Sequence, residues 1–257
     1  MNLMTPAHLK TLAAATLLAA SAARAENNTG MPDGSKDVSF AATAFDTPRS
    51  EGGKRRQVGV LPSFTGRWSN GVFAALGEVG LDLSDDPVLN WGPLLTYDLR
   101  QRRTDDPSDK GGLDVEGGGF IHYLWASNIN FNSGVLYGGG ANRTGIKLVG
   151  DVDLSLRLGP HASLTLSPGF ELVNASYMKS SFGVTPTQSA NDGLAPYATH
   201  AGLKNVFLNA GINWQLSNKW TMSTGVNTTR LVGSAGKSPL TQQRTTATEY
   251  LQFSYHY

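Results

Sequence analysis

The chain has no cysteine among its 257 residues, and this absence removes whole classes of chemistry. Without thiols there is no disulfide framework, no thiol nucleophile and no cysteine metal site, so hydrogen bonding and packing must hold the fold. A surplus of either charge is missing too, since 21 basic and 20 acidic residues leave a net charge of +1. Nucleic-acid-binding domains carry a basic field, and nucleic acid is therefore excluded as a partner.

Long apolar runs are missing after the amino terminus, where Leu12–Ala20 follows Lys10 and precedes Ala23-Arg24-Ala25. This arrangement predicts a cleaved secretory signal peptide over residues 1–25. The run is shorter than the roughly 20 residues that a membrane helix needs. The mean hydropathy of -0.22 is that of a soluble protein. A β-barrel gives the same value, because its polar lumen-facing residues offset its lipid-facing ones.

What the chain has instead is an alternation of apolar and polar residues with a period of two. The alternation is clearest over Lys204–Leu216 and Ile146–Leu158. Such segments, separated by turn residues, predict an all-β fold, an antiparallel transmembrane β-barrel. About ten strands are expected, near 57–67, 72–83, 89–101, 112–125, 129–139, 145–158, 162–178, 201–216, 220–232 and 246–257. Twelve strands are the alternative, if Val38–Phe45 joins the wall.

The last strand sets the expected topology, because an outer-membrane barrel closes on it with one apolar face toward lipid. Its apolar face consists of Leu251, Phe253, Tyr255 and Tyr257. Counting back from a periplasmic carboxyl terminus places the long loops 102–111, 179–200 and 233–245 outside and the turn 84–87 inside. By the same count Trp68–Gly71 is external, residues 26–56 form a polar periplasmic segment, and the barrel covers 57–257.

The expected lumen is narrow and carries charges of both signs, which argues against a wide general porin. Asp151 and Asp153, with Asp114 and Glu116, could in principle perform acid–base chemistry or bind a cation. Basic side chains share that face, so salt bridges across the lumen are the favoured interpretation. The expected basic partners are Lys147, Arg157 and Arg100.

Other chemistry-bearing residues are interpreted as structural. The histidines are scattered without the spacing of metal ligands, and no catalytic, cofactor-binding or metal-binding residue is assigned. The glycine runs 117–119 and 138–140 lack the lysine of a phosphate loop and are expected in the barrel wall. The tryptophans, at 68, 91, 125, 214 and 220, are expected to form an aromatic girdle.

Several short blocks resemble a known family. The most specific is Phe182-Gly183-Val184-Thr185-Pro186-Thr187-Gln188-Ser189-Ala190, which precedes Gly193-Leu194 and Gly202-Leu203-Lys204-Asn205-Val206. Upstream are Asp85-Asp86-Pro87 and Gly117-Gly118-Gly119. In this order the blocks resemble the OmpV/MipA family, the MltA-interacting proteins of Gram-negative outer membranes, over roughly residues 38–257. The chain departs from the family pattern at Ser50, where an aromatic residue is usual, and in its Tyr-His-Tyr ending.

The resemblance implies a non-enzymatic scaffold in the cell outer membrane. The family's named member links a lytic transglycosylase to a penicillin-binding synthase during peptidoglycan growth. The alternatives are a narrow channel for small solutes and a surface adhesin. The expected partners are outer-membrane lipid, the barrel-assembly machinery and the two murein enzymes, with no cofactor.

Two sets of candidate functional residues follow. The loop 179–200 is either a binding loop or a lid that stabilises the barrel rim. By family analogy, the last strand is also the signal that the barrel-insertion machinery reads. The candidates are Phe182, Gly183, Val184, Thr185, Pro186, Gln188, Ser189 and Ala190 in the loop, and Leu251, Phe253, Tyr255 and Tyr257 in the strand.

Overall fold

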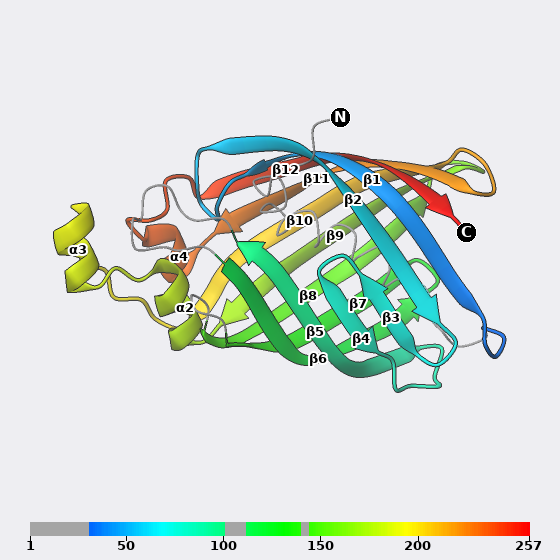
Figure 1. Cartoon of the computed structure of the whole chain (residues 1–257), viewed down its shortest axis with the longest axis horizontal. Coiled ribbons are helices and arrows are strands. Elements are labelled where there is room, and N and C mark those ends of the chain that lie inside the picture. Colours follow the sequence, from blue (N-terminus) through cyan, green and yellow to red (C-terminus); the bar gives the residue numbers. More distant parts are fainter. Residues whose placement is uncertain (1–30, 101–111, 140–143) are drawn as a thin grey trace, which may run out of the picture.

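The computed structural model describes residues 31–100, 112–139 and 144–257, which form a closed antiparallel barrel (Figure 1). The signal peptide expected at 1–25 lies outside the described residues. The wall strands are β1 (Lys36–Pro48), β2 (Arg56–Trp68), β3 (Val72–Ala75), β4 (Glu78–Leu81), β5 (Leu89–Arg100), β6 (Gly112–Ala126), β7 (Ile129–Gly139), β8 (Thr144–Arg157), β9 (Ala162–Val173), β10 (Gly202–Gln215), β11 (Trp220–Leu231) and β12 (Thr245–His256).

Within the described ranges, three short helices accompany the barrel, and all of them lie at the same end (Figure 1). They are α2 (Ala175–Phe182), α3 (Pro186–Asp192) and α4 (Gly233–Lys237). Helix α3 projects away from the barrel, whereas α2 and α4 lie close to the strand ends. Among the described residues, no helix is long and apolar enough to cross a membrane.

The barrel closes between its first and last strands. β1 pairs with β12 from Ser39↔His256 to Asp46↔Glu249, and it pairs with β2 along its whole length. The final backbone N–H, that of Tyr257, donates to the Val38 carbonyl at 3.0 Å. The last strand therefore finds its hydrogen-bonding partner in the first strand of the wall, as a lipid-embedded sheet requires.

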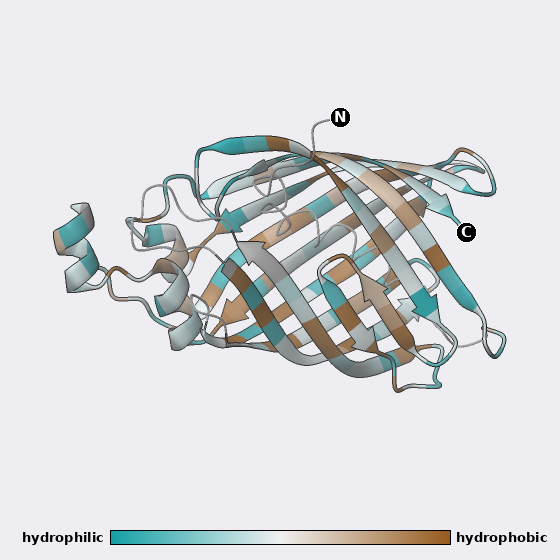
Figure 2. Cartoon of the chain, in the orientation of Figure 1, coloured by the Kyte–Doolittle hydropathy of each residue, from teal (hydrophilic) through white to brown (hydrophobic). Residues whose placement is uncertain are grey.

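Hydrophobic and hydrophilic residues follow one another along the strands (Figure 2), and their side chains alternate between the two faces of the wall. On β2, Val58 is 80% exposed and Val60 is 66% exposed on the outer surface. On β1, Phe40 points outward while Thr43 and Thr47 are buried inside. An apolar exterior and a polar interior are the arrangement of a barrel that faces lipid.

The two ends of the barrel differ in the length of their connections. The end that holds Tyr257, called here the short-turn end, has connections at 69–71, 82–88, 127–128, 158–161 and 216–219. The opposite end, called the long-loop end, includes 49–55, 174–201 and 232–244. Short turns face the periplasm in bacterial outer-membrane barrels, which gives the orientation.

The wall has twelve strands, which is the number that the sequence left open beside about ten. Val38–Phe45 lies inside β1, so the first strand begins well before residue 57. Residues 72–83, expected as one strand, form the short hairpin of β3 and β4. Gly77, at φ 93°, lies in the two-residue turn between them, where a left-handed conformation suits such a hairpin.

The two extra strands correct the expected topology near the amino terminus. Residues 26–56 are not a single periplasmic segment, because 36–48 form strand β1 of the wall and 49–55 lie at the long-loop end. The turn 69–71 lies at the short-turn end, opposite to the expectation. The strand expected over 162–178 ends at Val173, where Asn174 begins a helix.

The glycine run 117–119 lies inside β6, as expected for a wall segment. A Cβ atom on Gly118 would lie only 1.9 Å from the Val135 carbonyl oxygen of β7. The absence of a side chain therefore permits this close approach of the two backbones.

Candidate functional site

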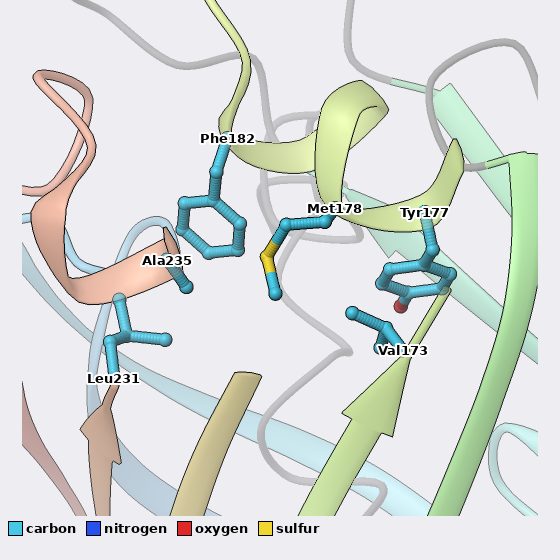
Figure 3. Close-up of a cluster of buried hydrophobic side chains, with 6 residues drawn as sticks. All are labelled: Val173, Tyr177, Met178, Phe182, Leu231 and Ala235. Carbon is cyan, nitrogen blue, oxygen red and sulfur yellow. The ribbon is translucent and has the colours of Figure 1, made fainter. Parts of the chain in front are cut away.

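Helix α2 lies over the mouth of the barrel at the long-loop end. Its N-cap is Asn174, whose Oδ1 accepts the Tyr177 N–H at 2.9 Å. Tyr177, Met178 and Phe182 point away from solvent toward the strand ends and α4 (Figure 3). The resulting apolar group, called the mouth cluster, is Val173, Tyr177, Met178, Phe182, Leu231 and Ala235.

Hydrogen bonds join the loop 174–201 to the loop 232–244. Ser238 Oγ donates to the Phe182 carbonyl at 2.7 Å, and Tyr197 Oη donates to the Ser234 carbonyl at 3.0 Å. Val184 and Tyr197 form a β-bridge at the base of the projecting segment. The two loops therefore form one ordered cap over the mouth cluster.

The family motif builds this cap. Phe182 is fully buried, and Val184 is 4% exposed beside the bridge to Tyr197. The Gly183 N–H donates to Lys179 O at the end of α2, where a Cβ atom would lie 2.6 Å from that same carbonyl oxygen. These contacts give the first half of the motif a structural role.

The second half of the motif starts α3. Thr185 is its N-cap and forms a capping box with Gln188, while Pro186 occupies the first turn. The Ser189 carbonyl accepts the N–H of Gly193, which ends the helix at φ 69°. Ala190 is exposed on the projecting helix. The sequence left open whether this loop is a lid or a binding loop. The contacts of the first half of the motif favour a lid, whereas the exposed α3 is free to act as a binding element.

Buried ion pairs lie directly beneath the mouth cluster. Lys204 Nζ bonds to Glu51 Oε1 at 2.9 Å and also to Glu171, while Lys147 pairs with Glu116. The ammonium groups of Lys204 and Lys147 lie 5.5 and 5.9 Å from the centroid of the Tyr177 ring. Both distances are within the range of a cation–π interaction, so the helix and the charges stabilise each other.

The pairing of Lys147 with Glu116 confirms the expected salt bridge, but the role of Lys204 was missed. By the alternation of its strand, Lys204 falls on the same face as the apolar Val206 and Leu208. The pairing of β10 with β9 shifts between Leu203 and Asn205, and both Lys204 and Asn205 are buried. Such a bulge places two successive side chains on one face, and the alternation of residues gives no signal of it.

Midway along the lumen, neutral donors bind the carboxylates that were expected to need basic partners. Asn132 Nδ2 donates to Asp151 Oδ2 at 2.7 Å and to Asp153 Oδ2 at 2.8 Å. Ser167 Oγ donates to Asp153 as well. His122 Nδ1 lies 2.6 Å from Asn132 Oδ1, which orients the amide for these bonds. Arg157 is exposed near the short-turn end, and the side chain of Arg100 lies outside the described residues.

The other side of the lumen is lined by uncharged polar residues. Thr47 and Thr248 share a hydrogen bond of 2.8 Å, and Gln252 Nε2 donates to Thr43 Oγ1 at 3.0 Å. We call this surface the neutral wall. It comprises Thr43, Thr47, Asn209, Asn213, Thr221, Ser223, Asn227, Thr229, Thr248 and Gln252.

The terminal strand shows the alternation that its sequence predicts. Leu251 and Phe253 are exposed on the outer surface, and the Tyr255 ring packs edge-on against Trp220 at 5.1 Å. Tyr257 is 78% exposed at the strand end, with Lys36 Nζ 5.9 Å from its ring centroid. All five tryptophans lie on strand segments at the short-turn end, namely Trp68, Trp91, Trp125, Trp214 and Trp220.

The histidines lie apart from each other. His256 bonds to Ser39 Oγ and Thr221 Oγ1, whereas His122 bonds to Asn132. His161 lies in a short turn, and the His200 backbone N–H donates to Ser234 Oγ. Across the described parts of the chain, no group of three or more His, Cys, Asp or Glu residues is placed to hold a metal ion.

The connection between β4 and β5, residues 82–88, is the longest at the short-turn end. Asp86 Oδ1 accepts the Val88 N–H at 2.7 Å, and Asp82 Oδ1 accepts the Ser84 N–H at 3.0 Å. Asp82 also accepts a hydrogen bond from the Asn90 side chain at 2.8 Å. This hydrogen-bonded turn exposes the carboxylates of Asp85 and Asp86 next to the apolar side chains of Pro87 and Val88.

Two solved structures with a similar outline are distant from this chain in sequence. The translocator domain of the autotransporter NalP from Neisseria meningitidis is 11% identical, with a TM-score of 0.48, and the match covers 98% of this chain and 96% of that chain. The NanC porin is 9% identical, with a TM-score of 0.45 and coverage of 86% and 99%. No curated protein matches the chain. A family model described as "MltA-interacting protein MipA" matches residues 40–257, and the chain therefore belongs to the MipA family.

Proposed function

We propose that this outer-membrane barrel is a non-catalytic docking protein whose short-turn end binds a lytic transglycosylase in the periplasm. The family description names an interaction with MltA, which supports a partner of that class. The observation that carries the proposal is the ordered turn 82–88, which presents carboxylates and apolar side chains on the periplasmic side.

The arrangement of the lumen also supports docking over transport. The mouth cluster packs α2 and α4 against the strand ends, and two buried ion pairs lie beneath it. Buried ion pairs with several hydrogen bonds resist separation, because a single charge left behind in a dry site is costly. An ordered cap at the long-loop end, held by such pairs, favours the short turns as the functional surface on the periplasmic side.

The periplasmic surface differs from the one expected for a separate amino-terminal segment. β1 runs within the wall from the short-turn end to the long-loop end, so the loop 49–55 is remote from the short-turn end. The turn 82–88, and not the amino-terminal segment, is therefore the proposed contact with the lytic transglycosylase. A penicillin-binding synthase, implied by the family resemblance, would be the second partner in a scaffold role.

The test uses the detergent-solubilised barrel and a purified lytic transglycosylase. Asp85→Lys combined with Val88→Ser should reduce binding about tenfold or more, because both the charge and the apolar contact are lost. The matched control is Asn218→Lys with Leu216→Ser in the β10–β11 turn, which also removes an exposed apolar side chain and adds a lysine. Equal binding by the two variants would refute the 82–88 contact, and no binding by the unaltered barrel would refute the function.

A narrow solute channel is the second candidate, and the neutral wall favours it. Hydroxyl and amide side chains can hydrogen-bond to small polar solutes without trapping ions. Conductance in planar bilayers separates the two candidates, since docking alone predicts no stable open steps. Steady conductance by the unaltered barrel would establish the channel and show that the mouth cluster does not seal it.

A further inference from the structure

We infer that the long-loop rim formed by β1, β2, β11 and β12 binds the phosphate groups of lipid A in the outer leaflet. The surface consists of the loops 49–55 and 232–244 with the adjoining strand ends. The two loops form one unit, because the N–H groups of Gln242 and Gln243 each donate to the Gly52 carbonyl at 2.9 Å. Lys54 N–H also donates to Gln242 Oε1 at 3.3 Å.

This surface has a surplus of exposed positive charge. Its carboxylates are Asp46, Glu51 and Glu249, of which Asp46 bonds to Arg56 at 2.9 Å and Glu51 to the buried Lys204 at 2.9 Å. Seven exposed basic side chains lie on the same surface, against three carboxylates. They are called the basic rim and comprise Arg49, Lys54, Arg55, Arg56, Arg230, Lys237 and Arg244.

The strand geometry places the basic rim at the height of lipid head groups. Arg230 lies ten residues after Trp220 on β11, so the two side chains share the outward face. At about 3.3 Å per residue and a tilt near 40°, ten residues rise about 25 Å. The apolar band of such barrels is also about 25 Å tall. Since Trp220 lies in the inner girdle, Arg230 reaches the opposite edge of the band.

The wall beneath the basic rim is apolar. Val58 and Val60 of β2 are the most exposed of these side chains, and Leu251 and Phe253 of β12 lie beside β1. A ligand that fits this surface carries phosphate above and acyl chains below. Lipid A has both, and as a component of the outer leaflet it meets the rim at this height, whereas free phosphate offers only the anionic half.

Binding can be measured with the full barrel in detergent and diphosphorylated lipid A as the probe. The test variant combines Lys54→Gln, Arg55→Gln and Arg230→Gln, and it keeps Arg56 and Arg244, whose guanidinium groups bond within the rim. The matched control combines Lys36→Gln, Arg157→Gln and Lys219→Gln at the short-turn end. Both variants lose three positive charges.

The test variant should bind lipid A about tenfold or more weakly, whereas the control should stay within about twofold, because each basic residue near a charged surface contributes separately. If the triple variant fails to fold, Arg230→Gln alone should weaken binding about threefold or more. Dephosphorylated lipid A should bind as weakly to the unaltered barrel as lipid A binds to the test variant. Equal binding with or without the phosphates, or equal losses in both variants, would overturn the inference. Displacement of lipid A by inorganic phosphate or phosphatidylglycerol at equal concentration would also overturn it.

Discussion

The two sides of the lumen satisfy their inward-facing polar groups with different kinds of partner. On β6, β8, β9 and the start of β10, buried charges are paired or hydrogen-bonded to neutral donors. On β1, β11, β12 and the rest of β10, hydroxyls and amides bond to each other across adjacent strands. We call the charged side the ionic wall, formed by Asp114, Glu116, Lys147, Asp151, Asp153, Glu171 and Lys204.

The difference shows on which side of the lumen the stability of the barrel depends more strongly on paired residues. An ionised group in a low-dielectric interior needs its partner, and the loss of one partner costs several kcal/mol. A hydroxyl that loses its partner costs less, and an apolar replacement of both partners is nearly neutral. The ionic wall also lies under α2, so its charges position the cap, whereas the neutral wall contributes no such contact to Tyr177 among the contacts described.

The largest effect is expected from Lys204→Met. The change leaves Glu51 and Glu171 near each other without the shared ammonium group, which should lower the free energy of unfolding by about 3–5 kcal/mol. Urea titration in lipid vesicles, followed by tryptophan fluorescence, measures this value. Lys36→Met at the short-turn end is the control. A loss below about 1 kcal/mol would mean that water replaces the ammonium group.

A double-mutant cycle on Lys147 and Glu116 should reveal coupling within the ionic wall. Lys147→Met alone and Glu116→Gln alone each remove one charge of this buried pair, whereas the double variant removes both charges. The double variant should be less destabilised than the sum of the single variants, by about 0.5–3 kcal/mol. The same urea titration measures it, and strict additivity would contradict the pairing.

A double-mutant cycle on the neutral wall should show smaller effects than the loss of Lys204. Thr47→Val and Thr248→Val each keep the shape of the side chain but leave one buried hydroxyl without its 2.8 Å partner. Each single variant should lose about 1–3 kcal/mol, and the double variant should recover much of that loss. If the single variants match the unaltered barrel in urea titration, water must satisfy the remaining hydroxyl.

The smallest effect is expected for an ion pair on the outer surface. Asp46 and Arg56 are more than a third exposed, and their 2.9 Å contact lies at the rim. Asp46→Asn should change the free energy of unfolding by less than about 1 kcal/mol. Comparison with Lys204→Met tests the claim that burial, and not ion pairing as such, makes the ionic wall sensitive.

Much of the fold can be predicted from local patterns. The alternation over Ile146–Leu158 and Lys204–Leu216 places strands β8 and β10, because a wall between lipid and a polar interior imposes a period of two. The strand count is harder to predict. β3 and β4 have four residues each, too few to show a period, and Gly77 is a weak signal for the turn between them.

The mouth of the barrel was the least predictable region. The Phe182–Ala190 motif was recognised, but its structural role depends on contacts with Ser238 and Tyr197, which lie far away in sequence or across the loop. The contact between Glu51 and Lys204 joins residues that lie far apart in the sequence. Only the closure of β1 on β12 and the bulge in β10 bring such groups together.

By itself, the sequence determined that the chain is a barrel, which face of most strands meets lipid, and that the last strand closes the wall. These properties are local, since each follows from the alternation of neighbouring residues. Tertiary structure alone decided the count of twelve, the position of the 49–55 loop and the pairing of charges beneath α2. Those properties depend on register and on contacts between distant segments, and alternation does not specify either of them.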